Sequence, residues 1–160
     1  MTDKTLTPAV LTAAHLSAVA QLEQLCFAEP WSERSLQLLC QANGKGVVIL
    51  SEEDDTCALA YAGLTHVLDE ASVTNIAVHP EFRRQGLGRA VTEALIKQAE
   101  QLCVCSLYLE VRPSNAAAIA LYDSLGFERM GSRPGFYRFP TEDALVMRLA
   151  LPRPITELKD

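Results

Sequence analysis

The sequence predicts an α/β protein whose helices pack against a mixed β-sheet. Two observations carry this prediction: apolar strand-like segments separated by turns occupy 46–78, and a strand–helix–strand–helix order follows over 73–125. Strands joined by short turns pair antiparallel, whereas strands joined through a helix pair in parallel, so both pairings are expected in one sheet. With 160 residues, 49% of them hydrophobic, the chain is expected to form a single domain over 1–160 with a core over about 8–151.

One strand and two helices are expected in the first third of the chain. Residues 8–12 form the predicted strand, and 13–26 form a predicted helix because apolar residues recur there at three-to-four spacing. Ser32 is a good cap for a second helix that runs to about Gln41. Gly44 closes that helix, since glycine is the usual residue after a helix end.

Three further strands are expected next. The apolar segments 46–51, 57–67 and 71–78 are joined by an acidic turn at 52–55 and a short turn at 68–70. The acidic residues of the first turn are most simply a solvated hairpin.

Two helices and three strands complete the prediction. A long helix opens at 84–89, and a second covers 115–125 with Gly126 as its stop. The remaining predicted segments are a strand at 106–111, strands at 127–130 and 144–151 around a loop at 133–143, and a mobile tail at 152–160.

The segment Arg84-Gln85-Gly86-Leu87-Gly88-Arg89 is a candidate phosphate site. The first turn of a helix carries unpaired backbone N–H groups and a partial positive charge, and glycines allow another group to approach that backbone closely. Arginines add fixed positive charge, which favours a phosphate or pyrophosphate. A basic helix start without a ligand is the alternative. The glycine spacing matches neither the dinucleotide fingerprint nor the phosphate loop that ends in G-K-[ST].

Composition argues against several other classes of protein. The net charge of −6 argues against a broad grip on nucleic acid, and no apolar stretch is long enough to span a bilayer. The five cysteines form no C-x-x-C pair, and His15, His66 and His79 are not spaced as metal ligands, so we expect reduced thiols and no metal. The start of the sequence lacks signal-peptide character, and we expect a cytoplasmic protein.

The sequence NIAVHPEFRRQGLGR at 75–89 resembles the acetyl-coenzyme A motif of the GNAT N-acetyltransferases. The sequences EPWSE at 29–33 and LEVRPSNAAAIALYDSLGF at 109–127 resemble, more specifically, the RimI branch of that family, whose members acetylate the N-terminal alanine of a small-subunit ribosomal protein. The resemblance covers roughly 28–149. It implies a sheet of about seven strands flanked by about four helices, with acetyl-CoA entering where the fourth and fifth strands separate.

The resemblance also implies a set of site residues. The residues that bind acetyl-CoA in the matching motifs are Ile76, Ala77, Val78, Arg84, Gln85, Gly86, Leu87, Gly88, Arg89 and Asn115. Glu110 matches the general base and Tyr122 the general acid, while the backbone N–H of Val78 is the expected donor to the thioester carbonyl.

Several of these residues, and Trp31, also have a structural alternative; the side chains of Ile76, Ala77 and Val78 could simply belong to the core. Glu110 lies near the end of an apolar strand, where desolvation would make it more basic, but it could instead pair with Arg112 on the same strand face. Tyr122 could be a buried structural tyrosine, and Asn115 on the same helix face could simply cap its helix. Trp31 could anchor the core or line a peptide cleft.

The resemblance implies a protein N-terminal acetyltransferase that uses acetyl-CoA and acts on a basic ribosomal protein, without binding nucleic acid or membranes. Tyr137 matches a region that lines the peptide site, but the stretch 135–144 is shorter than the usual pattern, which leaves the peptide preference open. Two alternatives remain open: an acetyltransferase for a small amine or internal lysine, and a CoA-binding partner protein without catalysis.

Overall fold

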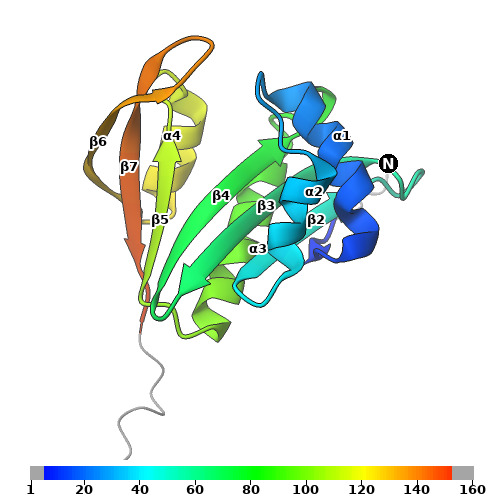
Figure 1. Cartoon of the computed structure of the whole chain (residues 1–160), viewed down its shortest axis with the longest axis horizontal. Coiled ribbons are helices and arrows are strands. Elements are labelled where there is room, and N and C mark those ends of the chain that lie inside the picture. Colours follow the sequence, from blue (N-terminus) through cyan, green and yellow to red (C-terminus); the bar gives the residue numbers. More distant parts are fainter. Residues whose placement is uncertain (1–5, 153–160) are drawn as a thin grey trace, which may run out of the picture. The chain divides into compact units, whose positions relative to one another are not determined.

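A computed structural model describes residues 6–152 of the chain. Within these residues, seven strands form one sheet in the order β1-β2-β3-β4-β5-β7-β6 (Figure 1). The strands are β1 (Ala9–Val10), β2 (Gly44–Leu50), β3 (Ala58–Val67), β4 (Glu70–Val78), β5 (Ser106–Val111), β6 (Glu128–Tyr137) and β7 (Glu142–Ala150). The predicted tail at 152–160 lies outside the described residues except for Pro152.

Four α-helices accompany these strands in the described chain. They are α1 (Leu16–Cys26), α2 (Glu33–Leu36), α3 (Leu87–Gln101) and α4 (Ala116–Ser124). Ser32 caps α2 as predicted, because its side-chain oxygen accepts a hydrogen bond from the Ser35 N–H at 3.1 Å. The expected helix from Ser32 to Gln41 is α-helical for only four residues and then tightens into a 3₁₀ helix, Gln37–Cys40. Such tightening is common in short helices, which gain little from propagation.

The strand pairing confirms a mixed sheet. Strand β2 pairs antiparallel with β1 and β3, while β4 pairs parallel with β5 through Glu70–Ser72 and Ser106–Tyr108. Strand β7 pairs antiparallel with β5 and with β6. The parallel pair is the one joined through α3, as the strand–helix–strand pattern predicts.

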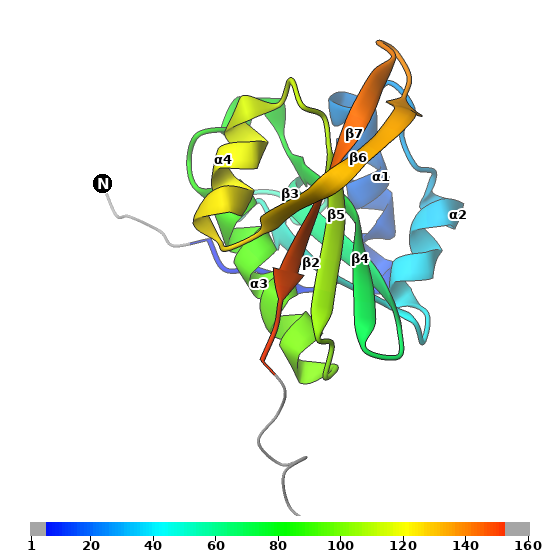
Figure 2. The same cartoon turned by 90° about the vertical axis from the view of Figure 1, so that its left-hand side faces the viewer.

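The described chain divides into two compact units. The first contains 6–65 and 74–98. In it, α1 and α2 lie on one face of β2 and β3, and α3 lies on the other (Figures 1 and 2). Its core includes the buried side chains of Val19, Leu22, Leu36, Leu39, Val48 and Tyr61.

The second unit contains 66–73 and 99–152. The side chains of β5 alternate as predicted: Leu107, Leu109 and Val111 are buried, whereas Tyr108 and Glu110 on the other face are half-buried. Helix α4 lies beside β5 and β7 (Figure 2).

Strand β6 corrects one sequence prediction. It runs over ten residues instead of 127–130 and takes in part of the segment expected to be a loop. Its pairing with β7 shifts register between Arg129 and Gly131 and again between Arg133 and Tyr137. These irregularities accommodate Pro134, which has no N–H to donate and is tolerated in strands at edges and bulges.

Three findings bear on the classes of protein considered. No helix within 6–152 is long and apolar enough to cross a membrane. The described residues contain no cluster of three or more His, Cys, Asp or Glu side chains that could hold a metal ion. All five cysteines are free thiols.

Candidate active site

Strand β5 presents Glu110 with a charged partner from β6. The Glu110 Oε1 atom lies 3.2 Å from Arg133 Nη1, and the two side chains are 23% and 61% exposed, respectively. The alternative pairing of Glu110 with Arg112 is therefore wrong. The true partner lies 23 positions along the chain, and the β6–β7 pairing brings it to the site.

Arg112 instead joins β5 to the β6–β7 hairpin. Its guanidinium lies 3.3 Å from Glu142 Oε1 and donates to the carbonyl oxygens of Pro140 and Arg138, both at 2.9 Å. Glu142 also accepts from the Ser114 N–H and hydroxyl at 2.8 Å each. Hydrogen bonds from Ser114 and the Arg112 charge lower the pKa of Glu142, so this carboxylate stays ionised and fastens the loop before α4.

Tyr122 projects from α4 into the interior of the second unit. Its side chain is 7% exposed, and its ring centroid lies 5.7 Å from that of Phe127. Burial, with a smaller contribution from Tyr137, raises the pKa of Tyr122 to about 12. The phenol is therefore protonated at neutral pH, as a proton donor must be.

Tyr137 at the end of β6 interacts electrostatically with both Glu110 and Tyr122. Burial and the charge of Glu110 raise the pKa of Tyr137 to about 12, and Tyr137 in turn contributes to the raised pKa of Tyr122. The Arg112 guanidinium carbon lies 4.4 Å from the Tyr137 ring centroid, within cation–π range. Tyr137 therefore lies within electrostatic reach of Glu110 and, separately, of Tyr122.

Asn115 caps α4. Its side-chain oxygen accepts from the Ala118 N–H at 3.2 Å. The structural alternative for Asn115 is therefore correct, and a capping side chain at an exposed helix start can still contact a ligand.

In the first unit, the segment 84–89 forms an open turn that leads into α3. Gly86 has φ +81°, and a Cβ built on it would have nothing within 4 Å. Arg84 also has a left-handed backbone, with φ +65°. The helix starts at Leu87, so the N–H groups of Leu87 and Gly88 belong to its first turn, which has no intrahelical acceptors for them. This geometry fits the phosphate site predicted from the sequence.

The end of β4 is held by side chains that the sequence did not single out. The Val78 carbonyl accepts from Arg83 Nε at 3.2 Å and from the Cys26 thiol at 3.4 Å. The next N–H, that of His79, donates to the Leu59 carbonyl at 2.7 Å. The Val78–His79 peptide plane is therefore fixed by three hydrogen bonds, directly after Ile76 and Ala77 of the predicted cofactor strand.

The buried carboxylate of Glu23 is the polar centre of the first unit, and sequence reasoning missed it. Its Oε1 accepts from the Tyr61 hydroxyl and from Asn75 Nδ2, and its Oε2 accepts from the Trp31 N–H at 3.2 Å. Trp31 is itself half-buried against the core, as the core-anchor alternative predicts.

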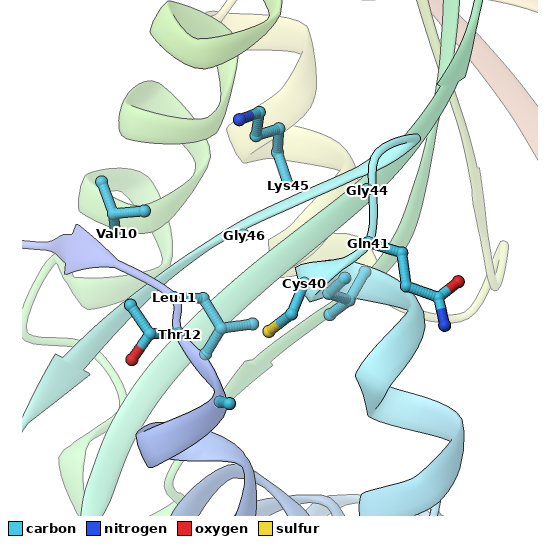
Figure 3. A pocket seen from close by; sticks show the side chains of 10 residues that line it. Val10, Leu11, Thr12, Cys40, Gln41, Gly44, Lys45 and Gly46 are labelled. Atoms are coloured by element: carbon cyan, nitrogen blue, oxygen red, sulfur yellow. The ribbon is translucent and has the colours of Figure 1, made fainter.

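The first unit also contains a surface pocket away from all these residues. It has a volume of about 320 Å³ and is lined by Val10, Leu11, Thr12, Ala13, Leu39, Cys40, Gln41, Gly44, Lys45 and Gly46. Figure 3 shows the Cys40 side chain directed toward Leu11, whereas Lys45 points away from both. None of the predicted site residues lines it.

The sequence matches the acetyltransferase (GNAT) family over residues 16–127, more than half of the chain. The chain belongs to the GNAT family. It is therefore an acetyltransferase, and Glu110, Tyr122, Asn115 and both predicted cofactor segments lie inside the part that matches.

Individual relatives are similar over nearly the whole chain. The [ribosomal protein bS18]-alanine N-acetyltransferase of Salmonella typhimurium is 44% identical over 149 residues, covering 91% of this chain and 97% of the relative. The crystal structure of the ribosomal-protein-S18-alanine N-acetyltransferase of Escherichia coli superposes with a TM-score of 0.85 at 39% identity, covering 98% of this chain and all of the other.

A more distant solved structure shares the fold. The structure of yncA from Salmonella typhimurium, solved with its cofactor acetyl-CoA, has a TM-score of 0.75 at 21% identity over 94% of this chain and 96% of that chain. This likeness concerns the fold alone. Together, the comparisons confirm the predicted GNAT fold and the resemblance to the RimI branch.

Proposed function

We propose that this enzyme transfers the acetyl group of acetyl-CoA to the N-terminal α-amine of a protein, and that its substrate is the N-terminal alanine of ribosomal protein bS18. The observation that carries the proposal is the 44% identity to a bS18-alanine N-acetyltransferase over nearly the full length of both chains. The net charge of −6 suits a basic ribosomal partner in the cytoplasm.

The proposed chemistry is direct transfer. Glu110, acting through a water molecule, removes a proton from the substrate ammonium and leaves a neutral amine. The amine nitrogen then attacks the thioester carbonyl, the new N–C bond forms, and the C–S bond breaks. The Val78 N–H stabilises the negative charge on the carbonyl oxygen, and Tyr122 gives its proton to the departing thiolate. The attacking nitrogen then loses its second proton, which returns through water to the Tyr122 phenolate, and Glu110 releases the first proton to solvent.

Acetyl-CoA binding is assigned to the residues that match the cofactor motifs of the family. The open turn at 84–89 and the first-turn N–H groups of α3 suit a pyrophosphate, and Arg84 and Arg89 supply positive charge. Ile76, Ala77 and Val78 would bind through their backbone, and Asn115 through its side chain. The reaction so written needs no metal.

A turnover assay with two peptides tests the substrate. One is a hexapeptide that matches the N-terminus of bS18, and the other has a blocked α-amine and a free lysine. Acetylation confined to the free α-amine supports the proposal. Acetylation of lysine would show an internal-lysine acetyltransferase instead, and acetyl-CoA binding without turnover of either peptide would show a non-catalytic CoA-binding protein or a different amine substrate.

The Glu110→Gln variant tests the base in the same assay. Because a general base contributes roughly 10²–10⁴-fold, kcat should fall by at least about tenfold while the affinity for acetyl-CoA stays unchanged. Unchanged turnover would remove Glu110 from this role.

A further inference from the structure

The ion pair between Glu110 and Arg133 joins two side chains of very different exposure. Glu110 is 23% exposed and stands on β5 between β4 and β7, whereas Arg133 is 61% exposed on a long side chain at the sheet edge. The Glu110 carboxylate is therefore held in place by its strand, whereas the Arg133 guanidinium can move away from it at a small cost in free energy. Exposed ion pairs contribute only about 0.2–1 kcal/mol, so their partners exchange readily.

Arg133 has a second contact in addition to Glu110, one that does not depend on the ion pair. Its guanidinium carbon lies 5.8 Å from the Phe136 ring centroid, which is within cation–π range. The backbone between the two residues is irregular, since the register shifts between Arg133 and Tyr137 and Gly135 has φ +62°.

The other ionisable side chains near Glu110 either pair with other groups or are uncharged. Arg112 on the same strand is bound to Glu142 and to two backbone carbonyls of the hairpin. Tyr137 and, beyond it, Tyr122 are neutral phenols. Among the residues that the structure describes, Arg133 is therefore the basic side chain that pairs with Glu110.

We propose that Arg133 is an exchangeable counter-ion of Glu110, which the α-ammonium group of the substrate displaces when the peptide binds. The inference rests on the proposed role of Glu110. A peptide α-amine has a pKa near ~8 and arrives mostly as a cation at neutral pH. The two cations compete for one carboxylate, so Arg133 weakens peptide binding. Arg133 is in this sense a positioning residue, because it acts through Glu110.

The Arg133→Gln variant tests the competition. The KM of the free-amine peptide should fall about two- to fivefold, the range that an exposed ion pair provides, while kcat and the KM of acetyl-CoA stay within twofold. The difference from wild type should shrink as salt is added, because salt screens the pair. Arg133→Lys keeps the cation and should restore wild-type values.

One further readout separates this mechanism from simple steric obstruction of the peptide by the Arg133 side chain. Inhibition by the N-acetylated product peptide, which brings no cation, should be equal in wild type and Arg133→Gln.

Arg129→Gln is the matched control. Arg129 stands on the same strand with the same 61% exposure, but it pairs with Asp123 at 3.4 Å. If Arg133→Gln behaves like Arg129→Gln in KM and in its salt dependence, or if it changes binding of free and acetylated peptides equally, the inference is overturned. Glu110→Gln run alongside separates the two failures: normal turnover of Glu110→Gln defeats the proposed base, whereas slow turnover with an unresponsive Arg133→Gln defeats this inference alone.

Discussion

Glu23 and Tyr61 meet in the interior of the first unit, where the Tyr61 hydroxyl donates a hydrogen bond to Glu23 Oε1. Asn75 Nδ2 donates to the same oxygen at 2.6 Å, and the Trp31 N–H donates to the other. One carboxylate therefore joins α1 to β3, to β4 and to the loop before α2. All three partners are donors, which matches the acceptor-only chemistry of an ionised carboxylate.

Replacement of Glu23 by alanine should lower the free energy of unfolding by about 2–4 kcal/mol, since it leaves three donors without their acceptor. Urea denaturation measures the change. Glu100→Ala removes an exposed carboxylate from α3 and should change stability by less than about 0.5 kcal/mol. Equal stability of the two variants would show that the buried cluster contributes nothing to folding.

Glu23 should also give stability a specific pH dependence. Burial raises the pKa of Glu23 above its ordinary value of 4.5, and the hydrogen bonds from Tyr61, Trp31 and Asn75 only partly oppose this. The folded state therefore binds this proton more tightly than the unfolded state. The resulting stabilisation is present below the unfolded pKa and is lost as pH rises through the folded pKa. The unfolding free energy of wild type relative to Glu23→Gln should thus fall as pH rises above the ordinary glutamate pKa of 4.5, and a flat difference would contradict the raised pKa.

The Tyr122→Phe variant should fold normally and turn over slowly. The ring keeps its packing against Phe127, but the proton donor is lost, so kcat should fall roughly 10²-fold or more. In wild type, Tyr122 should cause no loss of kcat between about pH 7 and 10, because its pKa is about 12. Near-normal kcat in Tyr122→Phe, with an unchanged melting temperature, would assign the proton to another donor.

The Gly86→Ala variant should separate backbone strain from cofactor binding. A Cβ at position 86 would have no atom within 4 Å, so the expected loss of about 1 kcal/mol in unfolding free energy comes from the left-handed φ of +81°. Gly135→Ala is the control, with φ +62° and equally open space. Both variants should lose similar stability, but only Gly86→Ala should weaken acetyl-CoA binding in a calorimetric titration. Equal affinities would place the pyrophosphate elsewhere.

The carboxylates of Glu142 and Asp143 accept hydrogen bonds from two different backbone N–H groups and should slow their exchange with solvent. Glu142 accepts from the Ser114 N–H and Asp143 from the Gly135 N–H, each at 2.8 Å. Amide hydrogen exchange at Ser114 should accelerate in Glu142→Ala and not in Asp143→Ala, and the reverse should hold at Gly135. Because Ser114 precedes the cap of α4, faster exchange there should accompany a lower kcat. Unchanged exchange at Ser114 would show that Glu142 does not fasten the loop.

Local patterns predicted most of the elements. Strand β5 has the bounds expected from its alternating side chains, and Ser32 and Asn115 cap the helices that their residue types favour. These features depend on neighbours within a few positions, which the sequence displays directly. The motif at 84–89 was likewise readable because the glycines and the helix start lie in one segment.

The interactions that were missed join residues far apart in the chain. Arg133 reaches Glu110 only because β6 continues past Pro134 with shifted register, and proline made that segment look like a loop. Glu23 lies at helical spacing from the buried Leu16 and Val19 of α1, but nothing nearby in sequence shows that Tyr61 and Asn75 will surround it. Long-range pairing of this kind depends on the completed sheet.

The irregular strand β6 also affects how readily copies of the protein associate through their sheet edges. An exposed sheet edge offers unpaired backbone groups on which a strand from another molecule can dock and start a chain of association. At one end of this sheet the edge strand β1 is only two residues long, and at the other β6 carries Pro134, shifted register and the charged side chains of Arg129 and Arg133. Neither edge gives a neighbour a long, regular surface to extend, which favours a protein that stays dispersed at the high concentrations of a crowded cell.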